Sequence, residues 1–215
     1  MVTCYVNLAV TAMRYQFLVE TYETEIIKVL SVWSMFDDAD LRRRPRNDDP
    51  RGRSLLEHMV HQSVSEDLWF KTMLGIQVTE NPLPAEETRI AFLRAYGRNS
   101  RLRLTALSTK DEAWWEGEAG FFDVRRTRLW IMTRRLTHTA HHRGQQTALL
   151  RMLEHDLHST YGPTADTGGL MMNHAPTIYA YPDESVLLEE EAQARRKRQL
   201  PGAGAQAVTE RPEKV

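Results

Sequence analysis

Residues 125–154 read RRTRLWIMTRRLTHTAHHRGQQTALLRMLE. The apolar side chains of this stretch return at helical intervals, as they do on the buried side of an α-helix. These positions include Trp130, Ile131, Leu136, Leu149, Leu150 and Leu153. The stretch therefore predicts a helix from about Arg125 to Glu154 that turns one face toward a core.

Three further segments show the same apolar periodicity, at residues 8–35, from Ser54 to Gly75, and at about 85–107. Ser54 is followed by Glu57, which is the S-x-x-E pattern of a capped helix start. No segment alternates with period two over a sustained length, so we expect no β-sheet. Four helices with modest connections favour an all-α fold, an antiparallel four-helix bundle.

Two connections differ in character. Residues 37–53 are polar and contain two prolines, which predicts a loop. Residues 108–124 are irregular and aromatic, and they form either a cap over one end of the bundle or an interface. The aromatic side chains of this second connection are Trp114, Trp115, Phe121 and Phe122.

The rest of the chain follows the last helix. Residues 156–187 contain too many glycines and prolines for a simple linker, yet too many aromatic residues for disorder. We therefore divide the chain into a bundle at 8–155, an ordered extended segment packed on it at 156–187, and a tail at 188–215. The tail is charged, and we expect it to begin as a frayed helix and to be partly disordered.

Composition narrows the functional classes. The 215 residues suit one domain, and 28 basic against 29 acidic side chains give no excess that would indicate a nucleic-acid partner. The single cysteine, Cys4, excludes both an internal disulfide and a cysteine-based zinc cluster. No apolar run approaches the roughly 18 residues of a membrane helix, and the N-terminus is a poor signal peptide. We expect a cytoplasmic protein with no membrane partner.

His138 and His142 lie four residues apart on the predicted last helix. Residues at i and i+4 share a helix face, so both imidazoles can reach one metal ion, as in the helical zinc motif H-E-x-x-H. Heptad counting from this pair leads to Ile131, Leu149 and Met152, so we expect the pair to point into the bundle. Ordinary core or half-exposed histidines are the alternative.

A third imidazole can come from a facing helix, and the second helix carries His58 and His61. His61 lies beside an apolar stripe and is the first choice, while His58 is the reserve ligand if His61 points away. Three neutral imidazoles leave a coordination position open, as in catalytic zinc sites. Such a site suits zinc, nickel, iron or copper, and we favour one zinc or nickel ion, with iron as a further possibility.

Two motifs carry a resemblance. The pattern H-x-x-H-H-R-G-Q is complete at residues 138–145, and His61 is followed by Glu66 five residues later and by Trp69 eight residues later. In these motifs the chain resembles the DinB/YfiT-like family, over about residues 10–155.

The resemblance implies an up-down-down-up four-helix bundle, often a homodimer, whose metal ligands would be His61, His138 and His142. It also implies that His141 is not a ligand and faces a neighbouring helix. The segment at 159–170, STYGPTADTGGL, departs from the shortest family members.

The resemblance also implies an activity. Family members with assigned activities are similar to metal-dependent transferases that use bacillithiol, mycothiol or a related low-molecular-weight thiol. The metal would lower the pKa of the thiol, and the thiolate would attack an electrophile such as an epoxide or an activated halide. Cys4 is far from the histidines in sequence, so a small-molecule co-substrate would supply the thiol.

Three residues are candidates for roles beside the metal. Glu66 and Tyr161 could act as a base or support a ligand, and Arg143 could hold a substrate carboxylate or form a structural ion pair. The alternatives are a hydrolase that uses a metal-bound water, a non-enzymatic metal-binding stress-response protein, and a plain bundle with a partner-binding surface.

Overall fold

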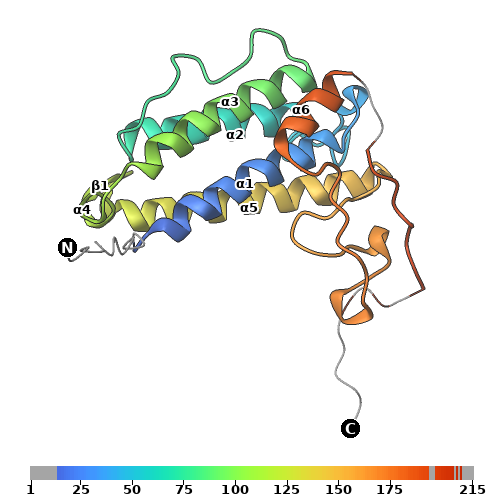
Figure 1. Cartoon of the computed structure of the whole chain (residues 1–215). Helices are drawn as coiled ribbons and strands as arrows, with labels where there is room; N and C mark the ends of the chain where they lie inside the picture. The colour runs from blue at the N-terminus through green and yellow to red at the C-terminus, as the bar shows by residue number, and fades with distance from the viewer. Residues whose placement is uncertain (1–13, 194–196, 206, 208, 210–215) are drawn as a thin grey trace, which may run out of the picture.

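The computed structural model describes residues 14–193, 197–205, 207 and 209. Within these residues the chain is mostly helical, and its long helices are α1 (Gln16–Ser34), α2 (Leu55–Thr72), α3 (Arg89–Ser108) and α5 (Arg128–Met152). Helices α1 and α5 run beneath α2 and α3 in Figure 1, and both α1 and α2 contact α3 and α5. The part of the predicted first helix before residue 14 lies outside the described residues.

Local capping determines where α2 and α3 begin. The Ser54 hydroxyl accepts a hydrogen bond from the Glu57 N–H, and the Glu57 carboxylate accepts one from the Ser54 N–H at 2.8 Å, which confirms the predicted capping box. Helix α3 begins at Arg89 and not at the predicted Ala85, because Thr88 adopts an extended backbone and caps the helix with its hydroxyl.

The long helices share one apolar core. Trp33 of α1 packs against Tyr96 of α3, with ring centroids 4.9 Å apart. Burial of such apolar surface is the main stabilising contribution to folding, and here it sets how α2 and α5 face each other. Fully buried members of this core include Ile26, Val29, Leu30, Leu55, Met59, Phe70, Leu93, Ile131, Met132 and Leu150. None of the described helices has both the length and the apolar character needed to cross a membrane.

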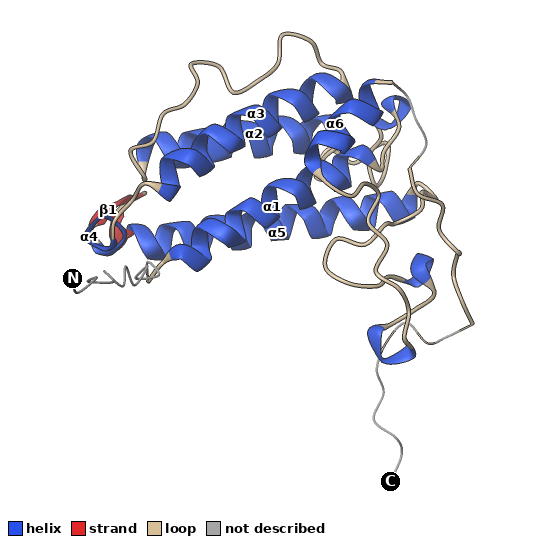
Figure 2. Cartoon of the chain, viewed as in Figure 1, coloured by secondary structure: helices blue, strands red, loops and turns tan. Residues whose placement is uncertain are grey.

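A β-hairpin closes one end of the long helices, which corrects the expectation of no sheet (Figure 2). Its strands have only four residues each, too few for a period-two pattern to stand out in the sequence. Helix α5 therefore starts at Arg128, later than predicted. The elements of this end are α4 (Glu112–Glu116), β1 (Glu118–Phe121) and β2 (Val124–Thr127).

The aromatic side chains of this end have two different surroundings. Trp115 is buried against the core, as a cap over the helices would be. Phe122, at the hairpin tip, is 74% exposed and lies 6.2 Å from the Trp69 ring of α2. The segment is therefore a cap that also presents one aromatic ring at the surface.

The C-terminal extension, residues 153–193, folds back over the other end of the helices (Figure 1). Its helix α6 (Glu184–Ala192) packs on α1 and α3, and Asp183 caps it by accepting a hydrogen bond from Val186. Helix α6 thus runs across residue 188, where the sequence predicts the start of the tail. Parts of that predicted tail lie outside the described residues. In the part of the chain that the structure describes, the short 3-10 turns are η1 (Asp38–Asp40), η2 (Ala165–Thr167) and η3 (Met171–Asn173).

Candidate metal centre

Helices α2 and α5 bring three imidazoles together. The Nε2 atom of His142 lies 3.0 Å from Nε2 of His61 and 3.1 Å from Nε2 of His138. All three potential ligand atoms lie within 4.8 Å of one another, so this group could hold a metal ion. His142 is 3% exposed, whereas His61 and His138 are half-buried, so the group lies at the border between core and solvent.

A pocket of about 380 Å³ opens onto this group. Its lining contains four histidines and two arginines, and none of these six side chains carries a carboxylate. The lining residues are Arg53, His61, Arg134, His138, His141 and His142. Apart from the metal ion itself, the charge of this lining therefore favours an anionic ligand.

The orientation of His142 suits a metal ligand. Its Nδ1 lies 2.9 Å from the amide oxygen of Gln145, which can only accept a hydrogen bond, so Nδ1 carries the ring proton. In a neutral imidazole Nε2 then bears the lone pair, and this lone pair faces His61 and His138. A hydrogen bond from the other ring nitrogen is the usual support of a metal-binding histidine.

His138 is held from two sides. Its ring stacks on Trp69, with centroids 5.7 Å apart and planes 6° apart. Nη1 of Arg135 lies 3.4 Å from Nδ1 of His138, and a guanidinium only donates, so Nδ1 accepts and Nε2 carries the proton that faces His142. To bind a metal through Nε2, this neutral ring would take the other tautomer, with the proton on Nδ1.

The imidazoles are neutral at ordinary pH. Burial, and next the charge of Arg135, lower the pKa of His138 to about 3. Burial lowers the pKa of His142 to about 4, although the hydrogen bond with Gln145 works in the opposite direction. The pKa of His61 is lowered by burial and then by the charges of Arg53 and Arg135. The lone pairs of this group are therefore not lost to protonation near neutrality.

His58 lies deeper, on the same helix as His61. It is 4% exposed, and its ring centroid lies 5.8 Å from that of His142. It does not belong to the group of ligand atoms within 4.8 Å, which His61 joins instead. Burial, and next the neighbouring His142, lower the pKa of His58 to about 4, so it packs as a neutral ring behind the group.

Two expectations on α5 are wrong. His141 was expected to face a neighbouring helix, but it is exposed and lines the pocket, with its ring 5.1 Å from that of His142. Met152 was expected on the buried face of the histidine pair, but it is 56% exposed. Heptad counting drifts by about 20° per heptad on a straight helix, and Met152 lies two heptads beyond His138.

Arg143 and Tyr161 meet away from this pocket. Arg143 is 2% exposed, forms a salt bridge with Glu25 of α1 and donates a hydrogen bond to the Tyr161 hydroxyl. The Lys28 ammonium group lies over the Tyr161 ring, 3.9 Å from the ring centroid, and Tyr161 is 64% exposed. The structure therefore does not bring either residue to the three imidazoles, and Arg143 has the contacts of a structural ion pair.

Glu66 is buried behind the histidines and is not exposed to solvent. Burial alone would raise the pKa of Glu66, but Arg135, Arg103 and two tyrosine hydroxyls together lower it below its ordinary value. Arg135 contacts both Glu66 and His138, so this arginine links Glu66 to the metal group. The hydrogen-bond partners of Glu66 are Tyr22, Tyr96, Ser100, Arg103 and Arg135.

Sequence reasoning did not identify Arg53 and Arg134 as site residues. Arg134 precedes His138 by one helical turn, and that i,i+4 spacing is a signal that could have placed it beside the pocket. Arg53 precedes the cap of α2, and no local pattern distinguishes it from the other arginines of its loop.

Asp37, Asp40 and His155 form a second group of potential ligand atoms in the described part of the chain. Here the contacts are internal. Asp40 accepts a hydrogen bond from the Asp37 N–H at 2.8 Å and contacts Nε2 of His155 at 2.6 Å. These contacts tie the end of α5 to η1 and account for the group without a metal.

Comparisons with known proteins agree with this architecture. The DinB family profile matches residues 19–168, which is well over half of the chain. A DinB-like protein from Bacillus cereus ATCC 10987 has a similar fold, with a TM-score of 0.59 at 16% identity over 68% of this chain and 97% of that one. No curated protein matches the sequence. Because this family profile matches well over half of the chain, the chain belongs to the DinB family.

Proposed function

We propose that this protein is a metal-dependent transferase that joins a low-molecular-weight thiol to an electrophilic small molecule. In this proposal α1, α2, α3 and α5 form a four-helix bundle, and His61, His138 and His142 hold one divalent transition metal. The observation that carries the proposal is the convergence of three neutral imidazole rings at the wall of an open pocket.

The spacing of the nitrogens supports a metal. Tetrahedral bonds of about 2.0–2.1 Å place neighbouring ligand nitrogens about 3.3 Å apart. The separations of 3.0 and 3.1 Å in the group are close to this value. Ligands that are all imidazoles suit zinc, nickel, iron or copper, and of these we propose zinc or nickel, with iron as a further possibility.

Such a metal, when bound, would lower the pKa of a thiol so that the thiolate is present near neutral pH. The thiolate sulfur would form a bond to the electrophilic carbon while the carbon–oxygen bond of an epoxide or the carbon–halogen bond of a halide breaks. The thiol proton would pass to water, the oxygen of the opened epoxide would take a proton from water, and a halide would leave as the anion. Arg53 and Arg134 would hold an anionic group of the thiol or the electrophile, the role first considered for Arg143.

One observation favours a non-enzymatic alternative. None of the residues that line the pocket carries a carboxylate, so in the described lining His141 is the one imidazole outside the metal group that could act as a base. Glu66 is fully engaged by its buried partners. This disfavours hydrolysis more than thiol transfer, since a thiolate needs no further base. A protein that only stores or senses a metal would have the same lining.

The first test is metal content. Untagged protein should contain near one transition metal per chain by elemental mass spectrometry, and a His138→Ala/His142→Ala variant almost none. His141→Ala is the matched control, because His141 lines the same pocket outside the group, and it should keep its metal. Equal, negligible metal in the parent and the double variant would disprove the site.

The second test is activity. Metal-loaded protein should accelerate the reaction of monochlorobimane with a panel of thiols that includes bacillithiol, glutathione and cysteine, and the double variant should not. Full metal content without acceleration for any thiol would favour the non-enzymatic alternative. We also propose that the protein is a homodimer, as the family resemblance implies, and that it is cytoplasmic, as the sequence features indicate. Sedimentation at micromolar concentration tests the dimer.

A further inference from the structure

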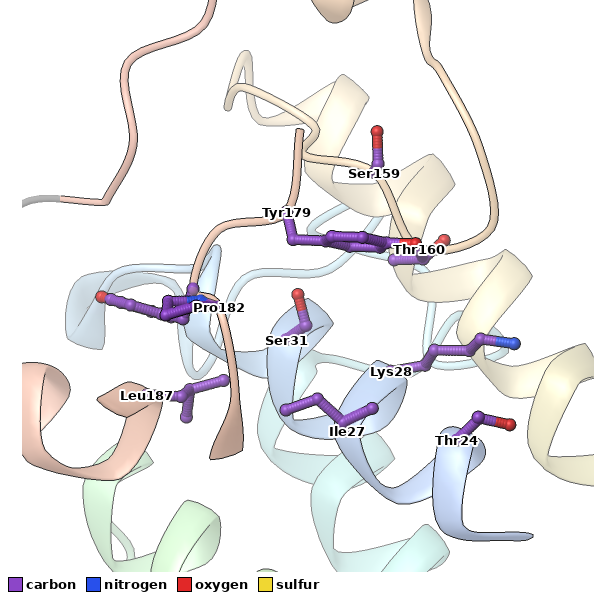
Figure 3. A pocket seen from close by; sticks show the side chains of 10 residues that line it. Thr24, Ile27, Lys28, Ser31, Ser159, Thr160, Tyr179, Pro182 and Leu187 are labelled. Atoms are coloured by element: carbon purple, nitrogen blue, oxygen red, sulfur yellow. The ribbon is translucent and has the colours of Figure 1, made fainter. Parts of the chain in front are cut away.

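A second pocket lies between α1 and the C-terminal extension (Figure 3). One face of α1 forms its floor, with Thr24, Ile27, Lys28 and Ser31 at successive helical turns. The extension and α6 form its other walls. Those walls consist of Ser159, Thr160, Tyr179, Tyr181, Pro182 and Leu187. No residue is shared between this lining and that of the pocket at the histidines.

The size and lining of this pocket suit a small ring. Its volume is about 170 Å³. An apolar cavity of about 150 Å³ in another protein holds benzene, so one six-membered ring with a small substituent fits here. Ile27, Pro182 and Leu187 supply apolar surface, and the rings of Tyr179 and Tyr181 supply flat faces on which a ring can pack.

One buried polar atom in the pocket lacks a partner. Ser31 is 8% exposed, and its hydroxyl has no hydrogen-bond partner among the described residues. Figure 3 shows this hydroxyl pointing from α1 toward the Tyr179 ring, into the space that the pocket occupies. Buried hydroxyls are normally hydrogen-bonded, so we expect the Ser31 hydroxyl to bond with an oxygen atom of a ligand.

The charges around the pocket favour a neutral ligand. Among the described residues of the lining, Lys28 is the only one with a charged side chain, and its ammonium group already pairs with Glu25 at 3.2 Å and lies over the Tyr161 ring. An anion would have to compete with Glu25 for it. The wall opposite is held in place, since Ser159 N–H donates to the Ile178 carbonyl at 2.8 Å and Ile178 N–H donates to the Ser159 hydroxyl at 3.0 Å.

We propose that this pocket binds a neutral single-ring molecule that carries one hydroxyl group, of which phenol is the simplest aromatic example. The ring packs between Ile27 and Tyr179, and the ligand hydroxyl bonds with that of Ser31. The site is independent of the metal centre and of the transferase activity proposed above.

The test uses phenol and toluene as probes, with binding measured by ligand-observed NMR on the full-length protein. Phenol should bind more tightly than toluene, which has the same ring without the hydroxyl. Ser31→Ala should weaken phenol binding about fivefold, the loss of one hydrogen bond, and leave toluene binding unchanged. Ser34→Ala is the matched control, because Ser34 is a buried serine of the same helix outside the pocket, and it should bind both probes normally.

Ile27→Trp provides a second variant, since the larger side chain fills the pocket from its half-buried floor. This variant should lose both probes while keeping its helical circular dichroism. Phenol binding that persists in a folded Ile27→Trp variant would overturn the site. Absence of phenol binding to the parent protein at millimolar concentration, or equal phenol affinity in the parent and Ser31→Ala, would overturn it as well.

Discussion

Glu66 with its buried hydrogen-bond partners and the three-histidine group both include side chains of α2 and α5, yet they use their polar atoms in opposite ways. At Glu66 every carboxylate oxygen is matched by buried guanidinium groups and hydroxyls. At His142 the Nε2 lone pair faces two other imidazole nitrogens and an open pocket. The polar groups around Glu66 are used in internal contacts, whereas those of the three-histidine group remain available for a ligand.

Loss of the Glu66 carboxylate should produce the largest effect on stability. Glu66→Ala leaves Arg103 and Arg135 buried without their shared carboxylate, and breaking a buried ion pair from one side costs about 3–5 kcal/mol. Urea unfolding measures this loss. Glu57→Ala, which breaks a half-exposed capping box, should cost only about 1 kcal/mol. Equal losses in the two variants would contradict the contrast between the regions.

Metal addition should stabilise the protein through the histidine group. A ligand that binds only the folded state at 100 times its Kd raises the free energy of unfolding by about 2.7 kcal/mol. We expect this gain when zinc or nickel is added to metal-free wild type, and none for His142→Ala, since the variant lacks the central nitrogen. Thermal or urea unfolding with and without metal gives the comparison, and an equal gain in the variant would place the metal elsewhere.

Removal of the support behind His142 should have a smaller effect, visible in affinity. Gln145→Ala deletes the amide oxygen that fixes the His142 tautomer, and loss of such a partner typically weakens metal binding 10- to 100-fold. Competition with a chromophoric chelator measures the Kd. Thr137→Ala, an exposed position on the same helix, is the control and should leave the Kd unchanged. A Gln145→Ala affinity equal to that of wild type would mean that packing alone orients His142.

The smallest effect concerns pH. The pKa of Glu66 is lower in the folded protein than its ordinary value near 4.5. A carboxyl group of this kind contributes stability above its unfolded-state pKa, and this contribution is lost as the pH falls through the folded-state pKa. The free energy of unfolding should therefore drop below about pH 4.5 in wild type, and less steeply in Glu66→Gln. Parallel pH profiles would show that other groups govern acid unfolding.

Much of the fold follows from local sequence. The long helices, the capping box at Ser54 and the one-turn spacing of His138 and His142 each depend on residues at most a few positions apart. The misplaced features are those that local patterns do not contain. The hairpin strands are too short to show alternation, and the exposure of Met152 depends on accumulated helical drift.

By itself the sequence determined the helical class, the family motifs and the pair of histidines on one helix face. Only the tertiary structure decided that His61 and not His58 joins this pair. It also decided that Arg53 and Arg134 line the pocket and that Arg143 forms a salt bridge with Glu25. Neighbouring residues on a helix point about 100° apart, so His142 and Arg143 serve different faces of α5. The packing of the core sets how α1, α2 and α5 are rotated relative to one another, and this rotation decides which helix each face contacts. No local sequence pattern predicts that rotation.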